Sequence, residues 1–384
     1  MPPLERWDIF CRVVDNYGDA GVCFRLARQL AAEHALDVTL WIDEPATLAR
    51  IAGGIDPQSP LQRAAGVTLR RLTSDLAAFE PAQVVVEAFG CGLPDGYVEA
   101  MARRRPAPAW LILEYLSAEP WVDAAHGLAS PHPASGLARR FWFPGFTART
   151  GGLLRERGLF AARDALAADP RAQRHWWQSM GLPPVAGDEI RISLFCYDAA
   201  PLEPLLDAWA AGAARVVCVV PEGVAAAALA RWTRGRPPRP GTPLECGGLR
   251  LHAMPFVAQD DYDRLLWLSS LNFVRGEDSF VRAQWASRTL VWHIYPQADA
   301  AHRAKLEAFL ARYAEGADPA AGDALRGLWR TWNAFAGSPP LDRAWLDYVA
   351  ARPHLDRHAR RWAETLAGLP ELAAGLVRAA HDAV

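Results

Sequence analysis

Two carboxylates lie four residues apart in a glycine-containing turn that follows the first apolar run of the chain. Asp15 and Asp19 flank Gly18, and Gly21 follows them, so the backbone there can bend tightly and approach a ligand closely. Two acids in such a turn can hold a cationic acceptor and take a proton from it. A structural alternative stays open, because aspartate is also a favoured helix cap and turn residue.

A second turn joins an apolar run to a helical pattern between Arg275 and Ser279. The free N–H groups at a helix start bind anions such as phosphate, and Arg275 could neutralise the charge of that phosphate. Glu277 could accept hydrogen bonds from sugar hydroxyls. The alternative is an ordinary cap at Asp278 and Ser279, since acids at a helix start also complement the helix dipole. From spacing alone, the anion site and the plain cap fit equally well.

Aromatic residues gather where the apolar runs end. A nucleobase that stacks on an aromatic face gains roughly 1–3 kcal/mol, so these rings are candidate nucleobase contacts. Aromatic residues at the ends of buried strands also often belong to the core, and this alternative stays open. The residues concerned are Tyr115, Phe195, Tyr197, Phe256 and Tyr295.

The elements that must position these residues are short apolar runs that alternate with amphipathic stretches. Apolar strands separated by helices predict a mainly parallel sheet with both faces covered. Strands are expected at 7–14, 38–42, 67–72, 84–88, 110–116, 190–197, 216–220, 249–257, 271–274 and 289–295. Helices are expected at 22–34, 201–211, 224–234, 260–270 and 279–286, with further helices toward the C-terminus.

The alternation breaks into glycines, aromatics and an arginine-rich stretch, which predicts a domain junction near residues 150–185. Two α/β halves in tandem predict an α/β protein of two Rossmann-like domains that face a cleft between them, with ligands at the carboxyl ends of the strands. The G-x-G-x-x-x-G run from Gly90 to Gly96 is one residue longer than the dinucleotide-binding fingerprint and follows a later strand. We therefore interpret it as a tight turn.

The composition excludes several classes of protein. The 384 residues are 51% apolar and carry a formal net charge of −2, which excludes a mainly disordered chain and argues against nucleic-acid or membrane binding through a basic field. Lys305 is the one lysine among 41 basic residues, so a single arginine is a weak functional clue. The six cysteines form no C-x-x-C pair and no zinc-type spacing. With no signal-peptide pattern and no apolar run of bilayer length, we expect a cytoplasmic protein.

Three blocks of the sequence resemble the signatures of the EarP family of bacterial protein-arginine rhamnosyltransferases. They lie in the expected order between residues 7 and 284, and none of their positions departs from the family pattern. The blocks are the segments around Val14-Asp15-Asn16-Tyr17-Gly18-Asp19, then Glu114-Tyr115-Leu116-Ser117-Ala118-Glu119, and then Arg275-Gly276-Glu277-Asp278-Ser279-Phe280-Val281-Arg282-Ala283-Gln284.

The resemblance implies a GT-B fold and an inverting transfer of rhamnose from dTDP-β-L-rhamnose to an arginine side chain of elongation factor P. This modification would activate the factor for rescue of ribosomes stalled at polyproline. The implied domains are an N-terminal acceptor domain at 1–155, a C-terminal donor domain at 185–350, and C-terminal helices at 351–384 that pack back on the N-terminal domain. No metal and no cofactor are expected beside the sugar nucleotide, and the expected partners include neither nucleic acid nor a membrane.

The resemblance also implies roles for individual residues. Asp15 and Asp19 would be the carboxylates at the acceptor, with Asp19 as the general base, and Glu277 would be a further essential acid. Contacts with the donor are expected for Asn16, Tyr17, Gly18, Tyr115, Phe195, Tyr197, Phe256, Gln259, Arg275, Asp278, Ser279 and Tyr295.

Three other functions stay open. Another GT-B transferase, with a different sugar nucleotide or a small-molecule acceptor, would share the α/β pattern and is disfavoured by the family signatures alone. An NAD(P)-dependent oxidoreductase would carry an early G-x-G-x-x-G, whereas the first turn has Gly18 and Gly21 without that triplet. A catalytically silent protein that only binds elongation factor P would not need Asp15, Asp19 and Glu277.

Overall fold

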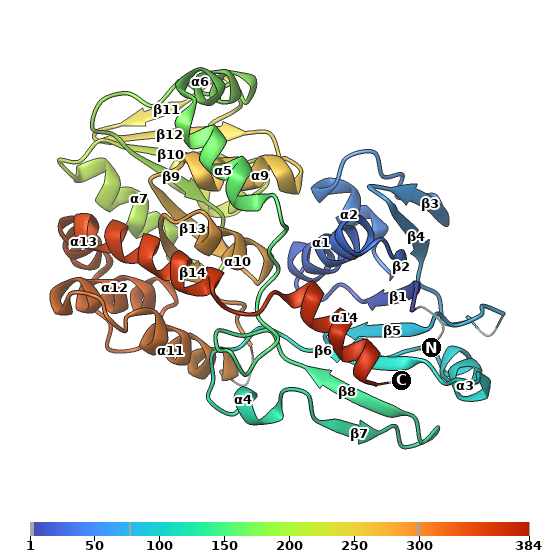
Figure 1. The fold of residues 1–384 in the computed structure, drawn as a ribbon. Helices are drawn as coiled ribbons and strands as arrows, with labels where there is room; N and C mark the ends of the chain where they lie inside the picture. Colours follow the sequence, from blue (N-terminus) through green and yellow to red (C-terminus); the bar gives the residue numbers. More distant parts are fainter. Residues whose placement is uncertain (1–3, 77, 298–299, 384) are drawn as a thin grey trace. The chain divides into compact units, whose positions relative to one another are not determined.

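The computed structural model describes residues 4–76, 78–297 and 300–383, which form two compact units (Figure 1). Unit 1 comprises Met1–Arg157 and Leu366–Val384, and unit 2 comprises Gly158–Thr365. Residues 158–184, expected to belong to the junction, are thus part of unit 2. The expected C-terminal segment 351–384 divides between the two units, because its last residues belong to unit 1.

Unit 1 is built on an eight-stranded sheet with the strand order β3-β4-β2-β1-β5-β6-β8-β7. The short pairs β3/β4 and β7/β8 at its two edges are antiparallel, and the strands between them pair in parallel. The strands are β1 (Arg6–Cys11), β2 (Asp37–Ile42), β3 (Leu61–Ala64), β4 (Val67–Arg71), β5 (Val84–Ala88), β6 (Ala109–Leu113), β7 (Ala129–Pro131) and β8 (Ala138–Trp142).

The core of unit 1 follows from its apolar runs. Strand β5 is buried along its whole length, as expected for a central parallel strand that is covered on both faces. A cluster of large side chains from β1, β2, α3 and β6 contains Phe10, Trp41, Tyr97 and Trp110. The helices of unit 1 are α1 (Tyr17–His34), α2 (Pro45–Ile51), α3 (Asp95–Arg103), α4 (Val122–Ala125) and α14 (Leu372–Asp382).

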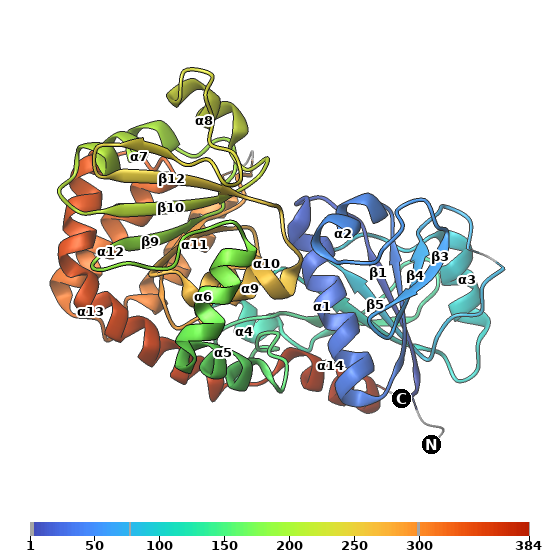
Figure 2. The ribbon, with the colours of Figure 1, turned by 90° about the horizontal axis from the view of Figure 1, so that it is seen from above.

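Unit 2 repeats this arrangement with six strands in the order β11-β12-β10-β9-β13-β14, of which the pair β11/β12 is antiparallel. In Figure 2 the strands β9, β10 and β12 lie side by side. The strands are β9 (Ile190–Leu194), β10 (Val216–Pro221), β11 (Leu244–Cys246), β12 (Leu249–Met254), β13 (Leu271–Arg275) and β14 (Thr289–His293). In both sheets the strand order reverses beside the first strand of the unit, and ligands of such folds bind at that point.

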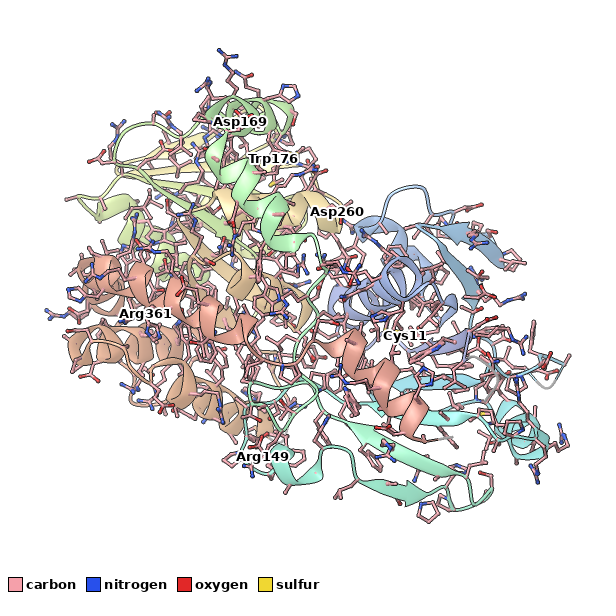
Figure 3. The ribbon with its side chains drawn as sticks, viewed as in Figure 1. Cys11, Arg149, Asp169, Trp176, Asp260 and Arg361 are labelled. Atoms are coloured by element: carbon pink, nitrogen blue, oxygen red, sulfur yellow. The ribbon has the colours of Figure 1, made fainter. Side chains whose placement is uncertain are left out.

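Nine helices of the described chain begin in unit 2. They are α5 (Leu159–Ala168), α6 (Pro170–Ser179), α7 (Leu202–Ala211), α8 (Ala226–Trp232), α9 (Gln259–Leu268), α10 (Asp278–Trp285), α11 (Ala301–Tyr313), α12 (Pro319–Trp332) and α13 (Leu341–Ala367). The carboxylate of Asp169 caps α6 by accepting hydrogen bonds from two N–H groups, and Trp176 lies further along this helix (Figure 3). Trp329 of α12 and Tyr348 of α13 both donate hydrogen bonds to the carbonyl of Leu290, which ties these helices to β14.

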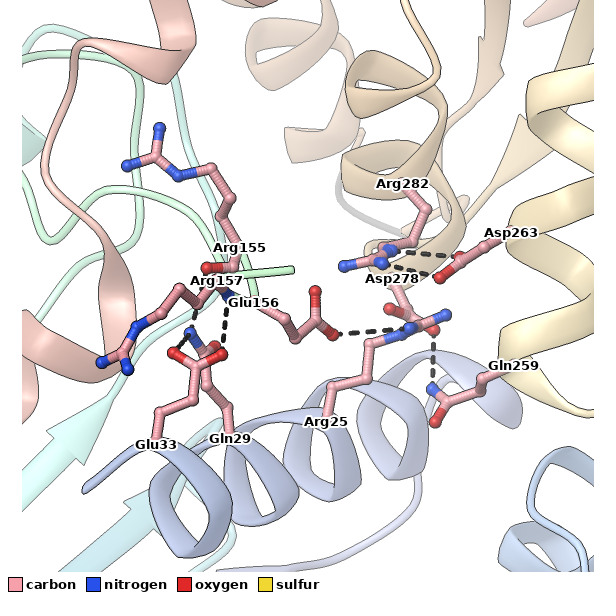
Figure 4. A network of polar contacts seen from close by, with 10 residues as sticks. All are labelled: Arg25, Gln29, Glu33, Arg155, Glu156, Arg157, Gln259, Asp263, Asp278 and Arg282. Atoms are coloured by element: carbon pink, nitrogen blue, oxygen red, sulfur yellow. Dashed lines mark hydrogen bonds and ion pairs between the residues drawn. The ribbon is translucent and has the colours of Figure 1, made fainter. Parts of the chain in front are cut away.

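The last helix, α14, belongs to unit 1, where it contacts β6 and α1. Its first turn is joined to residues before the second unit, because the N–H of Leu372 donates to the carbonyl of Leu153 at 3.1 Å. Helix α1 holds the same stretch: Gln29 donates to the carbonyl of Arg155, and the buried Arg25 pairs with Glu156 (Figure 4). The two sequence segments of unit 1 are therefore packed against each other.

Five predicted strands extend two or three residues too far at their carboxyl ends. The strands expected at 7–14, 110–116, 190–197, 249–257 and 289–295 end at Cys11, Leu113, Leu194, Met254 and His293. Apolar and aromatic residues continue beyond these points, but they leave the sheet and enter the loops that hold the candidate site. Helix α1 begins five residues before the predicted start at residue 22. The interpretation of Gly90 and Gly92 as a turn is confirmed, since both have a positive φ.

Candidate active site

The turn between β1 and α1 is held by the side chain of Asp19. This carboxylate is only 2% exposed, and its Oδ2 accepts hydrogen bonds from the N–H groups of Val14 and Asp15, each at 2.8 Å. Tyr115, which follows β6, is a neighbour that lowers the pKa of this carboxyl. Burial raises the pKa of Asp19 above its ordinary value of 3.8, against these hydrogen bonds, which lower it. Asp19 thus stabilises the turn through its hydrogen bonds, and its buried environment also makes the carboxylate a stronger base.

Asp15 is also buried and lies against Gly18. The N–H of Gly18 donates to the carbonyl of Asp15 at 2.7 Å, and Asn16 between them adopts a left-handed φ of 40°. A Cβ atom on residue 18 would come within 2.7 Å of the Asp15 Oδ2. Glycine at this position therefore leaves room for the Asp15 carboxylate, which a larger residue would displace.

Two residues that sequence reasoning missed complete this edge of the sheet. Asp43 follows β2, and its Oδ1 accepts a hydrogen bond from the N–H of Val13 at 3.0 Å. Phe89 follows β5 and stacks on Tyr115, with ring centroids 4.6 Å apart. Both lie at the carboxyl ends of parallel strands, so the rule that located Asp15 could also have located them.

In unit 2, the turn between β13 and α10 is fixed by Ser279 and Gly276. The Ser279 hydroxyl accepts a hydrogen bond from the N–H of Arg275 and donates one to the carbonyl of the same residue, while the indole of Trp292 donates to the carbonyl of Gly276. Gly276 has a positive φ of 60°. The serine hydroxyl therefore ties the helix start back to the strand, whereas an ordinary cap would accept from an N–H further along the helix. Glu277 lies at the start of α10 and is half-buried.

The side chain of Arg275 packs against two of the predicted aromatic residues. Its guanidinium carbon lies 4.4 Å from the ring centroid of Phe195 and 4.6 Å from that of Tyr197, and Nη1 donates to the carbonyl of Cys196. These cation–π and hydrogen-bond contacts connect the carboxyl ends of β9 and β13, the two strands at the point of reversal. Arg275 therefore orders the aromatic loop as well as bringing a positive charge to this edge.

Other predicted donor residues surround this loop. Phe256 lies 6.5 Å from Phe195 between ring centroids, and Tyr295 lies 5.5 Å from Tyr197. The N–H of Tyr197 donates to Nδ1 of His293, whose pKa is lowered to about 4 by burial and by the neighbouring Arg275 and His302. A neutral imidazole is required for that hydrogen bond, so the lowered pKa keeps the acceptor available near neutral pH.

Helices α9 and α10 are joined by polar pairs, which Figure 4 draws. Gln259 donates to Oδ2 of Asp278 at 2.9 Å, and Arg282 makes two hydrogen bonds to the carboxylate of Asp263, both side chains being buried. Asp263 is thereby neutralised inside the unit, and Arg282 acts as an internal counter-ion. The start of α10 thus has a fixed position beside α9.

The structure therefore gathers the predicted residues into two sets. In unit 1, Asp15, Asn16, Tyr17, Gly18 and Asp19 share one turn, and Tyr115 reaches it from the end of β6. In unit 2, the ends of β9, β12, β13 and β14 carry the set Phe195, Tyr197, Phe256, Gln259, Arg275, Glu277, Asp278, Ser279 and Tyr295.

In the part of the chain that the structure describes, no group of three or more His, Cys, Asp or Glu side chains is placed to hold a metal ion. None of the helices in that same part combines the length and the hydropathy needed to cross a membrane.

Comparison with known proteins identifies the family. Residues 7–381 match the family described as Elongation-Factor P (EF-P) rhamnosyltransferase EarP. The chain is 47% identical over 371 residues to a protein-arginine rhamnosyltransferase of Pseudomonas putida, and the match covers 97% of each chain.

Solved structures give the same result. A structure that describes EarP-mediated arginine glycosylation of translation elongation factor EF-P matches with a TM-score of 0.69 and 36% identity, over 99% of each chain. The spinosyn rhamnosyltransferase SpnG shares the fold, with a TM-score of 0.53 and 16% identity over 97% of this chain and 99% of its own. These matches argue against the oxidoreductase that the α/β pattern left open. The chain belongs to the EarP family of protein-arginine rhamnosyltransferases and has the GT-B fold of two Rossmann-like domains.

Proposed function

We propose that this protein transfers rhamnose from dTDP-β-L-rhamnose to one arginine side chain of elongation factor P, with inversion at the anomeric carbon and without a metal or cofactor. The modified factor would then act on ribosomes stalled at polyproline, in the cytoplasm. The observation that carries the proposal is the match to the EarP family over residues 7–381. The buried acid pair of the first turn supports it, because the acceptor of the reaction is a cation.

The acceptor is a difficult nucleophile, and this defines what Asp19 has to do. The guanidinium of arginine keeps its proton far above neutral pH, so it carries no free electron pair at neutral pH. A carboxylate cannot deprotonate it in advance, even one whose pKa is raised by burial as that of Asp19 is. We therefore place the proton transfer to Asp19 in the step in which the new C–N bond forms.

In this step one guanidinium nitrogen attacks the anomeric carbon of rhamnose, and the bond from that carbon to the diphosphate oxygen breaks. The electron pair of the broken bond leaves with dTDP, and one nitrogen proton moves to Asp19. Asp15 lies in the same turn and holds the guanidinium through charge-assisted hydrogen bonds. Attack from the face opposite the leaving group converts the β-linked donor into an α-linked product.

The leaving dTDP gains negative charge, which positive groups of unit 2 can stabilise. The start of α10 is the positive end of a helix dipole, and Arg275 contributes a positive charge at the end of β13. The aromatic residues Phe195 and Phe256 offer faces on which thymine can stack. Glu277, at the start of α10, accepts hydrogen bonds from sugar hydroxyls in this proposal.

Mass spectrometry of elongation factor P incubated with the protein and dTDP-rhamnose tests the reaction. We expect the mass of one deoxyhexosyl group to be added to an arginine. Asp19→Asn should reduce turnover by about 10²–10⁴-fold, because the amide cannot accept the proton although its oxygen can still accept the N–H groups of Val14 and Asp15. Asp37→Asn, at an exposed position of β2, is the matched control.

The outcomes separate the remaining alternatives. Addition of a different mass from another sugar nucleotide, with none from dTDP-rhamnose, would favour a transferase with a different donor. Binding of elongation factor P without any added mass would indicate the silent binder. Near-normal turnover by folded Asp19→Asn would exclude Asp19 as the base while leaving the reaction itself in place.

A further inference from the structure

The loop that leads to Asp15 begins where two strands stop pairing. The last partners in the register of β1 and β2 are Cys11 and Ile42. Beyond this point the chain leaves the sheet, and Val14 is 65% exposed. Because the ladder hydrogen bonds between the two strands end there, the loop needs other groups to hold its backbone in one position.

Asp43, the first residue after β2, supplies one such group. Its Oδ1 accepts a hydrogen bond from the N–H of Val13 at 3.0 Å. A side-chain carboxylate thus takes the part that a backbone carbonyl plays in the ladder of the sheet. A hydrogen bond to an ionised acceptor is roughly twice as strong as one between neutral groups, so this contact ties the loop firmly to the end of β2.

The backbone that Asp43 holds also holds the Asp19 carboxylate. Val14 directly follows Val13, and the N–H groups of Val14 and Asp15 both donate to Oδ2 of Asp19 at 2.8 Å. Each peptide unit is planar and rigid, so a shift of Val13 is passed on to the N–H of Val14. Asp43 and Asp19 are therefore connected through this stretch of backbone.

The helix after Asp43 contacts the same turn at a second point. Helix α2 begins at Pro45, and the guanidinium carbon of Arg50 lies 5.7 Å from the ring centroid of Tyr17, the first residue of α1. Cation–π contacts of this kind help to hold an aromatic ring in place. The segment after β2 thus contacts the turn both before and after Asp15.

We propose that Asp43 is a positioning residue for rhamnose transfer, because its carboxylate fixes the backbone whose N–H groups orient Asp19. The inference rests on the proposed function, since that function assigns Asp19 as the base. Val13 donates to Oδ1 of Asp43, so the role depends on a hydrogen-bond acceptor at this atom and not on negative charge. It requires no contact of Asp43 with the sugar nucleotide or with the acceptor arginine.

Two substitutions separate the acceptor oxygen from the charge. Asp43→Asn removes the charge but keeps an oxygen that can accept the N–H of Val13, so we expect kcat to stay within about threefold of the wild-type value. Asp43→Ala removes both, and the freed loop should misplace Asp19. A misplacement of about 1 Å at a reacting group costs about 10²-fold in rate, so kcat should fall roughly 10–100-fold. Neither variant should raise the KM for the sugar nucleotide, because Asp43 has no donor contact in this proposal.

Amide hydrogen exchange, measured by NMR, gives a readout that does not depend on activity. The N–H of Val13 should exchange about 10–100-fold faster in Asp43→Ala, because its hydrogen bond is lost, and close to the wild-type rate in Asp43→Asn. Asp318→Ala is the matched control, because Asp318 in unit 2 also accepts a backbone N–H, from Ala321 at 3.1 Å. It should change neither kcat nor the exchange of Val13.

Each level of the proposal fails in its own way. If Asp43→Asn is as slow as Asp43→Ala and has a raised KM for elongation factor P, the positioning role is wrong and Asp43 contacts the acceptor through its charge. A wild-type kcat for folded Asp43→Ala would also overturn the role, and if that variant does not fold, Asp43→Asn decides. A wild-type protein that transfers no rhamnose would contradict the proposed function, while the exchange of Val13 would still report whether Asp43 holds the loop.

Discussion

Replacing Gly18 by alanine should slow rhamnose transfer strongly while leaving the protein as stable as before. Gly18 is the second residue of α1, and its φ is not in the left-handed region, so the backbone accepts alanine. The obstacle is the neighbouring side chain: the new Cβ would lie 2.7 Å from Oδ2 and 3.2 Å from Cγ of Asp15. The Asp15 carboxylate must therefore move.

The size of this movement follows from the contact distance. An ordinary contact begins near 3.4 Å, so the carboxylate must recede by about 0.7 Å or rotate away. A misplacement of about 1 Å at a reacting group costs about 10²-fold in rate, so we expect kcat to fall by roughly 10–100-fold. Alanine favours the helix by up to about 1 kcal/mol over glycine, which offsets the cost of moving the carboxylate.

Initial rates with elongation factor P and dTDP-rhamnose, together with thermal unfolding, measure both quantities. Gly53→Ala is the matched control, because a Cβ added there meets no atom within 4 Å and should change neither quantity. A Gly18→Ala protein that is folded and turns over at the wild-type rate would refute the argument that the Asp15 carboxylate is required at its present position.

Two further predictions concern stability. Leu376→Ala in α14 removes a fully buried side chain and should destabilise the protein by about 2–5 kcal/mol in urea unfolding, whereas Arg378→Ala at an exposed position of the same helix should have little effect. His252 is 4% exposed, and burial together with nearby arginines lowers its pKa to about 4 in the folded protein. The neutral imidazole therefore contributes to the free energy of unfolding above pH 6.5, the pKa in the unfolded chain. This contribution is lost as the pH falls toward 4. His252→Gln should therefore reduce the loss of stability between pH 7.5 and 5 by about 2 kcal/mol, and His175→Gln, at an exposed position, should not.

The fold was predictable where apolar runs are buried on both faces. Residues 84–88 are β-branched over most of their length, and this run is β5 as predicted. The edge strands β3, β7 and β11 were not predicted, because they are short, partly exposed and lack a continuous apolar pattern. Helices α5 and α6 lie in the arginine-rich stretch that was expected to be a junction. Helix α5 is rich in alanine on all sides and so shows little amphipathic periodicity, whereas polar residues obscure the periodicity of α6.

The candidate site was predictable to the level of individual turns but not of contacts. The turns that hold Asp15 and Ser279 follow from the type and spacing of their residues. The stacking of Tyr115 on Phe89 and the packing of Arg275 on Phe195 join segments far apart in the sequence. Such contacts depend on which strands become neighbours, and the strand order is a property of the folded sheet.

The place of α14 in unit 1 has a consequence for how the protein is made. The ribosome synthesises all of unit 2 before it reaches Leu372, whose N–H bonds to Leu153. Until then, the surfaces of β6 and α1 that contact α14 have no cover from this helix. Unit 2 is continuous in sequence and can fold first, although its residues emerge second. The order of folding should therefore be the reverse of the order of synthesis. A chain that is truncated after Thr365 should contain a completed unit 2 and an incomplete unit 1.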